Sequence, residues 1–382
     1  MSDVGLSKWD TTVARVGLFA NVMPRAVASA RAAARGSDRL GIPPSKVGAR
    51  TVGESAVDEL FVAINSIVRD VSSIDDLASD VARCEEAAPI LTELGVTGVN
   101  QPQPVPTILR RTRKRFTTTV YELIDFYPEV NLPGPLAPYA PYLDGVVSAR
   151  VLAHDEPGRR WIIWVHGAGQ GRPDDLFTFR AAHLHEKLGY NVILPVLPAH
   201  GTRAHPSLDY PGFDPLENVA VTVRAIAEIR ALVAWANSAA PADITIAGTS
   251  LGGPLAAMVA GLEPSVSSVL ALVPMLGVHS TLAHHMDRAG ELGKTAAQLL
   301  RSDSVTAVTS VVDPLSVMPY AEPDRRLVIA ALNDRVTWVT AAQKLHDHWG
   351  GRIEWYPGGH VGHVFSGVVK SLTDEFLTEP LS

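Results

Sequence analysis

The 382-residue sequence has only one cysteine, Cys84, and no long apolar run. A single thiol excludes an intrachain disulfide and a cysteine metal cluster, and it is typical of a reducing compartment, so we expect a cytoplasmic protein. A membrane-spanning helix needs about 18 or more apolar residues in succession. The nearest candidate, residues 266–278, is shorter than that and contains Pro274 and Gly277.

Basic residues are not in excess either. The chain has 33 Lys and Arg against 40 Asp and Glu, a net charge of −7, which provides no global field that would attract nucleic acid. We therefore expect no nucleic-acid partner, and we interpret the basic run RRTRKR at residues 110–115 as the solvated beginning of a strand. The content of 46% apolar and 19% charged residues excludes a largely disordered chain and predicts a large core.

Residues 1–115 contain no recognisable catalytic motif and are expected to form a helical N-terminal extension and linker. An alanine-rich stretch at 26–34 and apolar residues at helical spacing in 57–71 predict helices there. Three prolines within 95–106 predict the linker. Residues 11–37 have four arginines and no acidic residue, which fits a helix packed on the body, a helix on a membrane surface or a targeting segment. Peripheral membrane contact is therefore left open.

Residues 116–382 have a different pattern, in which short apolar runs alternate with amphipathic stretches. The predicted strands are residues 116–124, 146–152, 161–165, 191–196, 243–247, 268–273, 326–331 and 352–356. The predicted helices are residues 174–188, 215–237, 254–263, 338–349 and 364–376. This alternation predicts an α/β fold, a mainly parallel sheet with helices on both faces. Its active site would lie beyond the carboxyl ends of the strands.

The segment that carries the clearest chemistry is Gly248-Thr-Ser-Leu-Gly252, which follows an apolar strand and precedes a helix rich in small residues. This is the G-x-S-x-G pattern of a nucleophile elbow, in the strand–turn–helix context that the pattern requires. The glycines allow a turn too sharp for side chains, and the turn holds Ser250 in a strained conformation with its hydroxyl presented. Ser250 is therefore the predicted nucleophile.

A serine nucleophile needs a base that is oriented by a third group. His360 follows the last predicted strand directly after Gly358 and Gly359, on a loop that leaves the imidazole free to point inward. We predict His360 as the base and keep His363 as the alternative base. The two histidines could also be read as metal ligands, but no obvious third ligand accompanies them, so we expect no metal and no cofactor.

The orienting acid is expected at the end of the strand before the last one. Asp334 occupies that place, after residues 326–331, and its role would be to accept a hydrogen bond from His360 and to stabilise the imidazolium. The alternatives are Asp313, Asp324 and Asp347. The first two precede the strand and the third lies in the following helix, so each is interpreted as a solvated aspartate.

An oxyanion needs two preorganised N–H donors. One is expected from Leu251, the residue after the nucleophile. The other is expected from the loop His166-Gly-Ala-Gly-Gln-Gly171 after strand 161–165, with Ala168 as the first choice and Gly169 or Gln170 as substitutes. The residues predicted to contact substrate are His166, Gly167, Gly169, Gln170 and His200.

With these motifs in the order HGAGQG, GTSLGG, NDRV and PGGH, the chain resembles the serine α/β-hydrolase superfamily, of the esterase and lipase type, over residues 116–380. The chain order Ser250, Asp334, His360 is the one expected for that fold. The resemblance implies cleavage of a small-molecule carboxylic ester, with an apolar acyl group, through an acyl-enzyme. It also implies a lid at residues 277–314, for which a plain connecting segment is the alternative.

The same triad serves every acyl transfer, so the sequence does not separate an esterase from an amidase, a peptidase or a thioesterase. A non-catalytic binding protein built on this fold is a further alternative, against which the complete set of triad candidates argues. The acyl length, the physiological substrate and the oligomeric state are not readable from the sequence.

Overall fold

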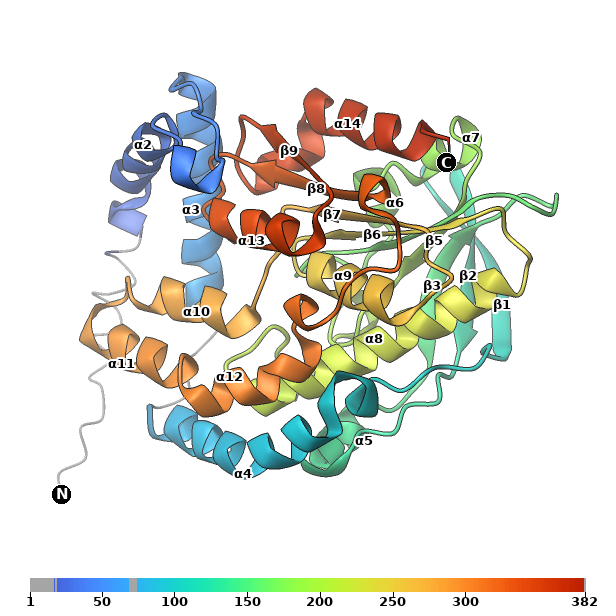
Figure 1. Cartoon of the computed structure of the whole chain (residues 1–382), viewed down its shortest axis with the longest axis horizontal. Helices are drawn as coiled ribbons and strands as arrows, with labels where there is room; N and C mark the ends of the chain where they lie inside the picture. The colour runs from blue at the N-terminus through green and yellow to red at the C-terminus, as the bar shows by residue number, and fades with distance from the viewer. Residues whose placement is uncertain (1–16, 18, 69–73, 381–382) are drawn as a thin grey trace.

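The computed structural model describes residues 17, 19–68 and 74–380. In this part of the chain, nine strands form one sheet in the order β1-β2-β3-β5-β4-β6-β7-β8-β9. The strands are β1 (Ile108–Phe116), β2 (Thr119–Phe126), β3 (Val147–Leu152), β4 (Trp161–Val165), β5 (Asn191–Pro195), β6 (Ile244–Thr249), β7 (Ser268–Leu272), β8 (Arg326–Ala331) and β9 (Arg352–Tyr356). Figure 1 shows the sheet through the middle of the molecule, with β1 at the right-hand end.

The strand directions explain where a site can form. β1, β2, β3 and β5 pair antiparallel in succession, whereas β5, β4, β6, β7, β8 and β9 are all parallel. The carboxyl ends of the parallel strands therefore meet at one edge of the sheet, where ligands bind in open α/β sheets. Strands β4, β6, β7 and β8 are buried along their whole length, which is why they read as continuous apolar runs.

Helices cover both faces of the sheet, as predicted. The α-helices of the described residues, including those that pack elsewhere, are α2 (Val22–Ala33), α3 (Ala49–Val68), α4 (Ile74–Val99), α5 (Ala140–Leu143), α6 (Asp175–Thr178), α7 (Ala181–Glu186), α8 (Pro215–Asn237), α9 (Gly252–Leu262), α10 (Val278–Met286), α11 (Gly290–Leu300), α12 (Asp303–Thr309), α13 (Val339–Trp349) and α14 (Gly367–Thr378). On one face, side chains of α8, α9 and α13 pack against alternate residues such as Ile163 and Ile246. On the other, α7 and α14 pack against Ile162 and Leu270.

The N-terminal region differs from its prediction in two respects. The expected boundary at residue 115 is wrong, because it falls inside β1, which pairs with β2 from Ile108 onward. The linker expected at 95–106 begins as predicted with a break at Gly95, whose backbone is not helical, but α4 resumes after this break and continues to Val99. Of the segment at 11–37, residues 11–16 and 18 lie outside the described residues, and α2 packs against α3. None of the helices in the described ranges is long and apolar enough to cross a membrane.

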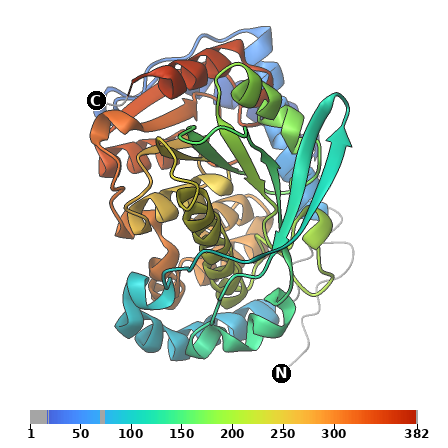
Figure 2. The same cartoon turned by 90° about the vertical axis from the view of Figure 1, so that its right-hand side faces the viewer.

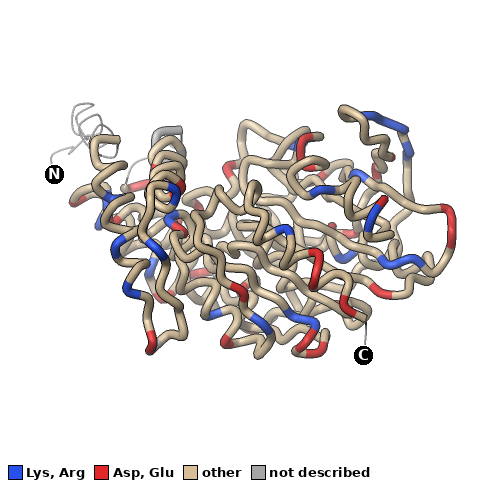
Figure 3. The backbone as a smooth tube through the Cα atoms, turned by 90° about the horizontal axis from the view of Figure 1, so that it is seen from above, with Lys and Arg blue, Asp and Glu red and all other residues tan. Residues whose placement is uncertain are grey.

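The basic run at 110–115 forms most of edge strand β1 instead of only its beginning. Its side chains are largely exposed, and Arg110 and Arg111 pair across the hairpin with Asp125 and Glu122 of β2. Charged side chains on an edge strand discourage pairing with a second chain. Figure 3 shows the Lys and Arg residues of this hairpin at the opposite end of the molecule from the N-terminal helices.

The predicted lid region, residues 277–314, folds as helices α10, α11 and α12. Side chains of α11 and α12 share a buried cluster with Leu77, Cys84 and Leu91 of α4. Figure 2 shows α4 and α5 along the lower edge, below α8. The N-terminal helices are therefore packed onto the body, and a movement of residues 277–314 stays a prediction.

Candidate active site

Ser250 lies on the turn between β6 and α9, with a backbone φ of +53°. This left-handed conformation is unusual for a residue with a side chain and is the strain predicted for a nucleophile elbow. A Cβ atom at Gly248 would lie 2.1 Å from the carbonyl oxygen of Gly252, and one at Gly252 would lie 2.2 Å from that of Val165. Both positions therefore require glycine, because no other side chain fits the turn.

The three predicted triad residues meet at the carboxyl edge of the sheet. The Ser250 hydroxyl donates to Nε2 of His360 across 2.9 Å, and Nδ1–H of His360 donates to Oδ2 of Asp334 across 2.8 Å. All three side chains are buried. The imidazole is thus held in the tautomer that leaves Nε2 free to accept the serine proton.

The Asp334 carboxylate is held by four hydrogen bonds. Oδ1 accepts from the N–H groups of Val336 and Thr337, both at 2.8 Å, and Oδ2 accepts from His360 and from the Thr337 hydroxyl at 2.9 Å. Burial alone would raise the pKa of Asp334, but His360 and the Thr337 donors lower it below the ordinary value. For His360, burial opposes protonation, yet the Asp334 charge and hydrogen bond raise its pKa. The ion pair of Asp334 and His360 is therefore suited to stabilising the protonated imidazole of His360.

The alternative triad residues are engaged elsewhere. His363 lies in the short helix η7 (Val361–Phe365), where its Nδ1–H donates to the carbonyl of His360 across 2.5 Å. Asp313 caps a turn through the N–H of Leu315, and Asp347 accepts from Gln343 on α13. The final helix begins at Gly367, not at 364 as predicted, because Ser366 caps it.

The predicted oxyanion donors lie on either side of the nucleophile. Leu251 is the first residue after Ser250. Ala168 lies on a loop that contacts the serine, because a Cβ atom built on the preceding residue, Gly167, would lie 3.2 Å from Cβ of Ser250. The N–H of Gly167 donates to Oε1 of Gln170 at 2.7 Å. No hydrogen bond to the N–H of Leu251 or Ala168 occurs among the described residues, which leaves both donors available.

His166 and His200 hold this loop in place. Nδ1–H of His166 donates to the carbonyl of Gly167 at 2.8 Å, and its Nε2 accepts from the N–H of Leu197 at 3.1 Å. His200 donates from Nδ1 to the carbonyl of Pro198 at 2.9 Å, and the two rings lie 5.2 Å apart. Burial, with His200 nearby, lowers the pKa of His166 to about 3, so it is neutral. Both nitrogens of His166 are thus occupied by backbone groups.

Two proteins of Mycobacterium tuberculosis resemble the chain over most of its length. They are uncharacterized protein MT2702 of strain CDC 1551 / Oshkosh and uncharacterized protein Rv2627c of strain ATCC 25618 / H37Rv. Each is 33% identical over 295 residues, which cover 73% of this chain and 69% of the relative. The chain belongs to their family. No family model matches the chain.

Solved structures of other proteins are also similar to the chain. An acetyl xylan esterase from Paenibacillus sp. R4 superposes with a TM-score of 0.50 and 15% identity, covering 80% of this chain and 95% of that one. Acetyl xylan esterase 1 from Thermoanaerobacterium sp. JW/SL YS485 has a TM-score of 0.46 at 15% identity, covering 80% and 98%. The first of these similarities confirms the predicted fold: the chain has the α/β-hydrolase fold.

A cavity of about 80 Å³ opens beside Ala168. Its other lining residues are almost all apolar: Phe61, Val62, Pro211, Phe213, Met275, Val278, Thr281, Leu282, His285, Met286 and Val336. Val336 follows Asp334 by two residues, so the cavity also borders the acid loop. Phe61 and Val62 come from α3, part of the N-terminal extension in which the sequence shows no catalytic motif. Their apolar spacing alone gave no signal of this position.

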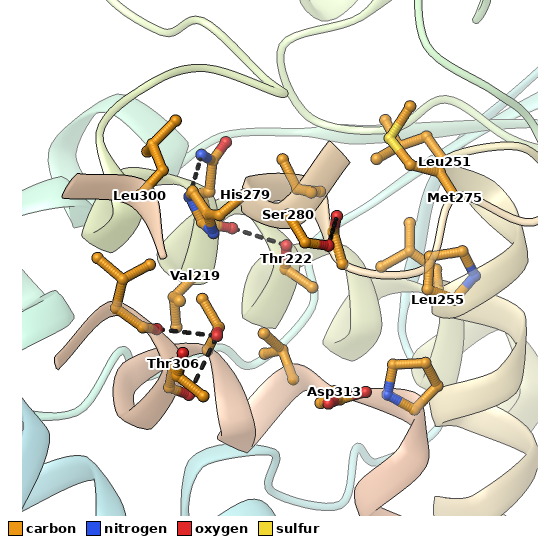
Figure 4. Close-up of a pocket in the computed structure, with 18 of the residues that line it drawn as sticks. Val219, Thr222, Leu251, Leu255, Met275, His279, Ser280, Leu300, Thr306 and Asp313 are labelled. Atoms are coloured by element: carbon orange, nitrogen blue, oxygen red, sulfur yellow. Dashed lines mark hydrogen bonds between the residues drawn. The ribbon is translucent and has the colours of Figure 1, made fainter. Parts of the chain in front are cut away.

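A second cavity, of about 270 Å³, lies beyond Leu251 and shares Met275 and Val278 with the first. Figure 4 shows Leu251, Leu255 and Met275 on one side of it and Val219 and Leu300 on the other. Its polar groups are already partly paired: Nδ2 of Asn218 donates to Nε2 of His279 at 2.8 Å. Burial lowers the pKa of His279 to about 4, so it presents a neutral ring.

Proposed function

We propose that the protein is a serine hydrolase that cleaves a carboxylic ester through an acyl-enzyme intermediate. The observation that carries this proposal is the continuous relay from Ser250 through His360 to Asp334, with distances of 2.9 and 2.8 Å. A serine hydroxyl is a poor nucleophile near neutral pH, and this relay supplies the adjacent base and the group that orients it.

The chemistry follows from the geometry. His360 Nε2 takes the proton as Ser250 Oγ forms a bond to the carbonyl carbon, and the carbonyl oxygen becomes an oxyanion that the N–H groups of Leu251 and Ala168 stabilise. Collapse of this intermediate breaks the bond to the alcohol oxygen, which receives the proton from His360. Water then attacks the acyl-enzyme with the same proton transfers in the same order, which releases the acid and restores Ser250.

The acyl group is expected to be apolar and small. The cavity beside Ala168 is apolar, and its volume of about 80 Å³ is far below the 300–1,000 Å³ typical of pockets for drug-sized ligands. An ester is also in keeping with the name of the structural neighbour, an acetyl xylan esterase. The proposed substrate class is therefore a small-molecule ester with a short acyl chain.

The primary test is covalent labelling. A fluorophosphonate probe should modify wild-type protein at Ser250, and Ser250→Ala should abolish the modification, because the probe needs an activated serine. Mass spectrometry of the labelled peptide gives the site. Ser267→Ala is a matched control, since this serine donates to the carbonyl of Ile244 at the opposite end of the strands. Folded wild type that stays unlabelled would contradict the proposal.

A substrate panel tests the acyl cavity. We expect kcat/KM for p-nitrophenyl esters to be higher for acetyl and butyryl than for octanoyl groups. Leu282→Ala should enlarge the cavity and favour octanoate over butyrate by about tenfold relative to wild type, since one methylene is worth about 10- to 200-fold in a fitted apolar pocket.

The matched control is Leu292→Ala, a leucine of α11 that is 39% exposed and does not line the cavity. An unchanged chain-length preference in Leu282→Ala would place the acyl group elsewhere. Assaying thioesters and aminoacyl amides alongside the esters decides between the reactions that the same triad can perform.

A further inference from the structure

Helix α3 turns a polar face toward the catalytic loops. Ser55, Asp58 and Glu59 are fully or almost fully buried, whereas Val57 and Leu60 are 49% and 41% exposed. A helix that merely anchors an N-terminal segment is expected to bury its apolar residues and to leave its acids in water. This helix buries Asp58 and Glu59 together with the apolar Val62 and Ala63, so its contacts with the body need a polar explanation.

Three carboxylates of α3 supply that explanation. Glu54 Oε2 accepts from the N–H of Gly359 at 2.8 Å, next to the predicted base. Glu59 Oε1 pairs with Nε of Arg335 at 3.0 Å, next to the predicted acid, and its Oε2 pairs with Arg288 from the lid region. Buried carboxylates are costly unless charges or N–H groups satisfy them, and here the catalytic loops do so.

Asp58 lies between these two contacts and touches both loops. Its Oδ2 accepts from the N–H of His360 at 2.6 Å and from that of Arg335 at 3.2 Å, while Oδ1 accepts from the N–H of Val361 at 3.0 Å. A carboxylate that accepts several backbone N–H groups makes strong, oriented hydrogen bonds. Asp58 therefore ties the residue after Asp334 to the backbone of His360 itself.

We propose that Asp58 is the positioning residue of this active site: helix α3 uses it to fix the His360 loop against the Asp334 loop. One turn further on, Phe61 and Val62 of the same helix line the small apolar cavity. Helix α3 thus completes the site from outside the sheet: Figure 1 shows it at the left-hand end of the molecule, and it contacts η7, the segment that follows His360. The proposal rests on the proposed hydrolase function.

The electrostatics around Asp58 agree with this role. Burial and the nearby Asp334 carboxylate raise the pKa of Asp58 to about 6, against the opposing effects of His360 and the N–H donors. In turn, the charge on Asp58 adds to that of Asp334 in raising the pKa of His360. Glu54 and Glu59 are further carboxylates of α3 that contact the same loops, and Arg335 is a cation on the Asp334 loop.

The test is Asp58→Asn in the full chain. An amide keeps the size of the carboxylate but replaces one acceptor oxygen by a donor, which must face one of the three N–H groups. We expect kcat for ester cleavage to fall about 10- to 100-fold with KM nearly unchanged, because the base is misplaced and not the substrate. The pKa of His360, followed by NMR titration of its imidazole, should fall as the negative charge is lost.

Two further variants separate positioning from general damage. Asp243→Asn breaks a buried ion pair with Arg160 at the amino end of β6, remote from the site, and should leave kcat within about twofold after correction for stability. Should Asp58→Asn fail to fold, Glu54→Ala removes the contact to Gly359 and a surface pair with Arg50, and it should lower kcat by about three- to tenfold. The Arg50 side chain is 71% exposed, so loss of that pair is expected to have little effect by itself.

The outcomes are distinguishable from failure of the proposed function. Wild type that neither labels nor cleaves esters refutes the hydrolase, and the NMR titration still reports on Asp58 and His360 without turnover. A folded Asp58→Asn with wild-type kcat and an unshifted pKa of His360 overturns the positioning role. If Asp58→Asn does not fold, an unchanged kcat in Glu54→Ala overturns the positioning role of α3.

Discussion

Replacing Asp334 by asparagine is expected to lower kcat for ester cleavage by about 10⁴-fold, while the protein stays folded. The reason is that only one of the two Asp334 carboxylate oxygens can be replaced by the amide NH₂ group of asparagine. Oδ1 accepts from two backbone N–H groups, those of Val336 and Thr337, which cannot reverse their direction. The new amide group must therefore occupy the place of Oδ2, where it faces Nδ1 of His360.

An amide donor at that place forces the wrong tautomer on the imidazole. Nδ1 of His360 would become the acceptor, and Nε2 would carry the proton, so it could no longer receive one from Ser250. The variant also lacks the negative charge that stabilises the imidazolium. A loss of 10⁴-fold corresponds to about 5.4 kcal/mol of transition-state stabilisation. Within the relay, only the loss of Ser250 or His360 is expected to lower the rate more.

The measurement is steady-state kinetics with a short-chain ester, together with the pH profile. Since the Asp334 charge raises the pKa of His360, the variant's residual activity should persist to lower pH than that of wild type. Asp347→Asn is the matched control, because this aspartate lies on α13 and accepts from Gln343. A variant at Asp334 with more than a tenth of wild-type kcat would show that another group orients the base.

Strands β4, β6, β7 and β8 of the α/β-hydrolase fold are predictable because they are buried on both faces, whereas β9 is only partly buried. Strands β4, β8 and β9 have the predicted ends, and β6 leads into the Ser250 turn as the motif requires. Residues that follow such strands are brought to one edge by topology alone, which is why Ser250, Asp334 and His360 could be proposed together from sequence.

Elements held by distant partners were not predictable. Strand β1 has charged residues at most positions and gains its conformation from pairing with β2, including the ion pair of Arg110 with Asp125. The single helix expected at 174–188 is interrupted by Arg180, whose φ is +55°. Arg180 is held there by Asp374 of α14, through contacts of 3.0 and 2.8 Å that no local pattern encodes.

The contribution of α3 was missed for a related reason. Apolar spacing predicted a helix over 57–71; α3 confirms it as far as Val68, and residues 69–71 lie outside the described residues. The usual assumption that apolar residues face the body holds for Val62 but not for Val57 and Leu60, which are exposed. Glu54 and Asp58 are four residues apart and so share one face of the helix, which was the available signal. Without the partner N–H groups of Gly359 and His360, a pair of acids four residues apart reads as a solvated face.

Replacing Gly252 by alanine is expected to destabilise the protein by about 3 kcal/mol or more and to lower the rate of fluorophosphonate labelling at least about 100-fold. A Cβ atom at this position would lie 2.2 Å from the carbonyl oxygen of Val165 and 2.7 Å from that of His166. Both obstacles are backbone atoms of the strand and loop that lead to Ala168, the proposed oxyanion donor. Neither can rotate away as a flexible side chain could.

The structure can relieve this overlap only by moving the start of α9 away from β4. That movement carries Leu251 and Ser250 with it, so the N–H donor and the nucleophile are both displaced from His360. Urea denaturation and labelling kinetics measure the two effects. Gly53→Ala is the matched control: this glycine lies within α3 with no atom within 4 Å of an added Cβ, so the change should stabilise the helix by about 0.5–1 kcal/mol. Equal stability and labelling in Gly252→Ala would mean that the elbow is looser than its contacts indicate.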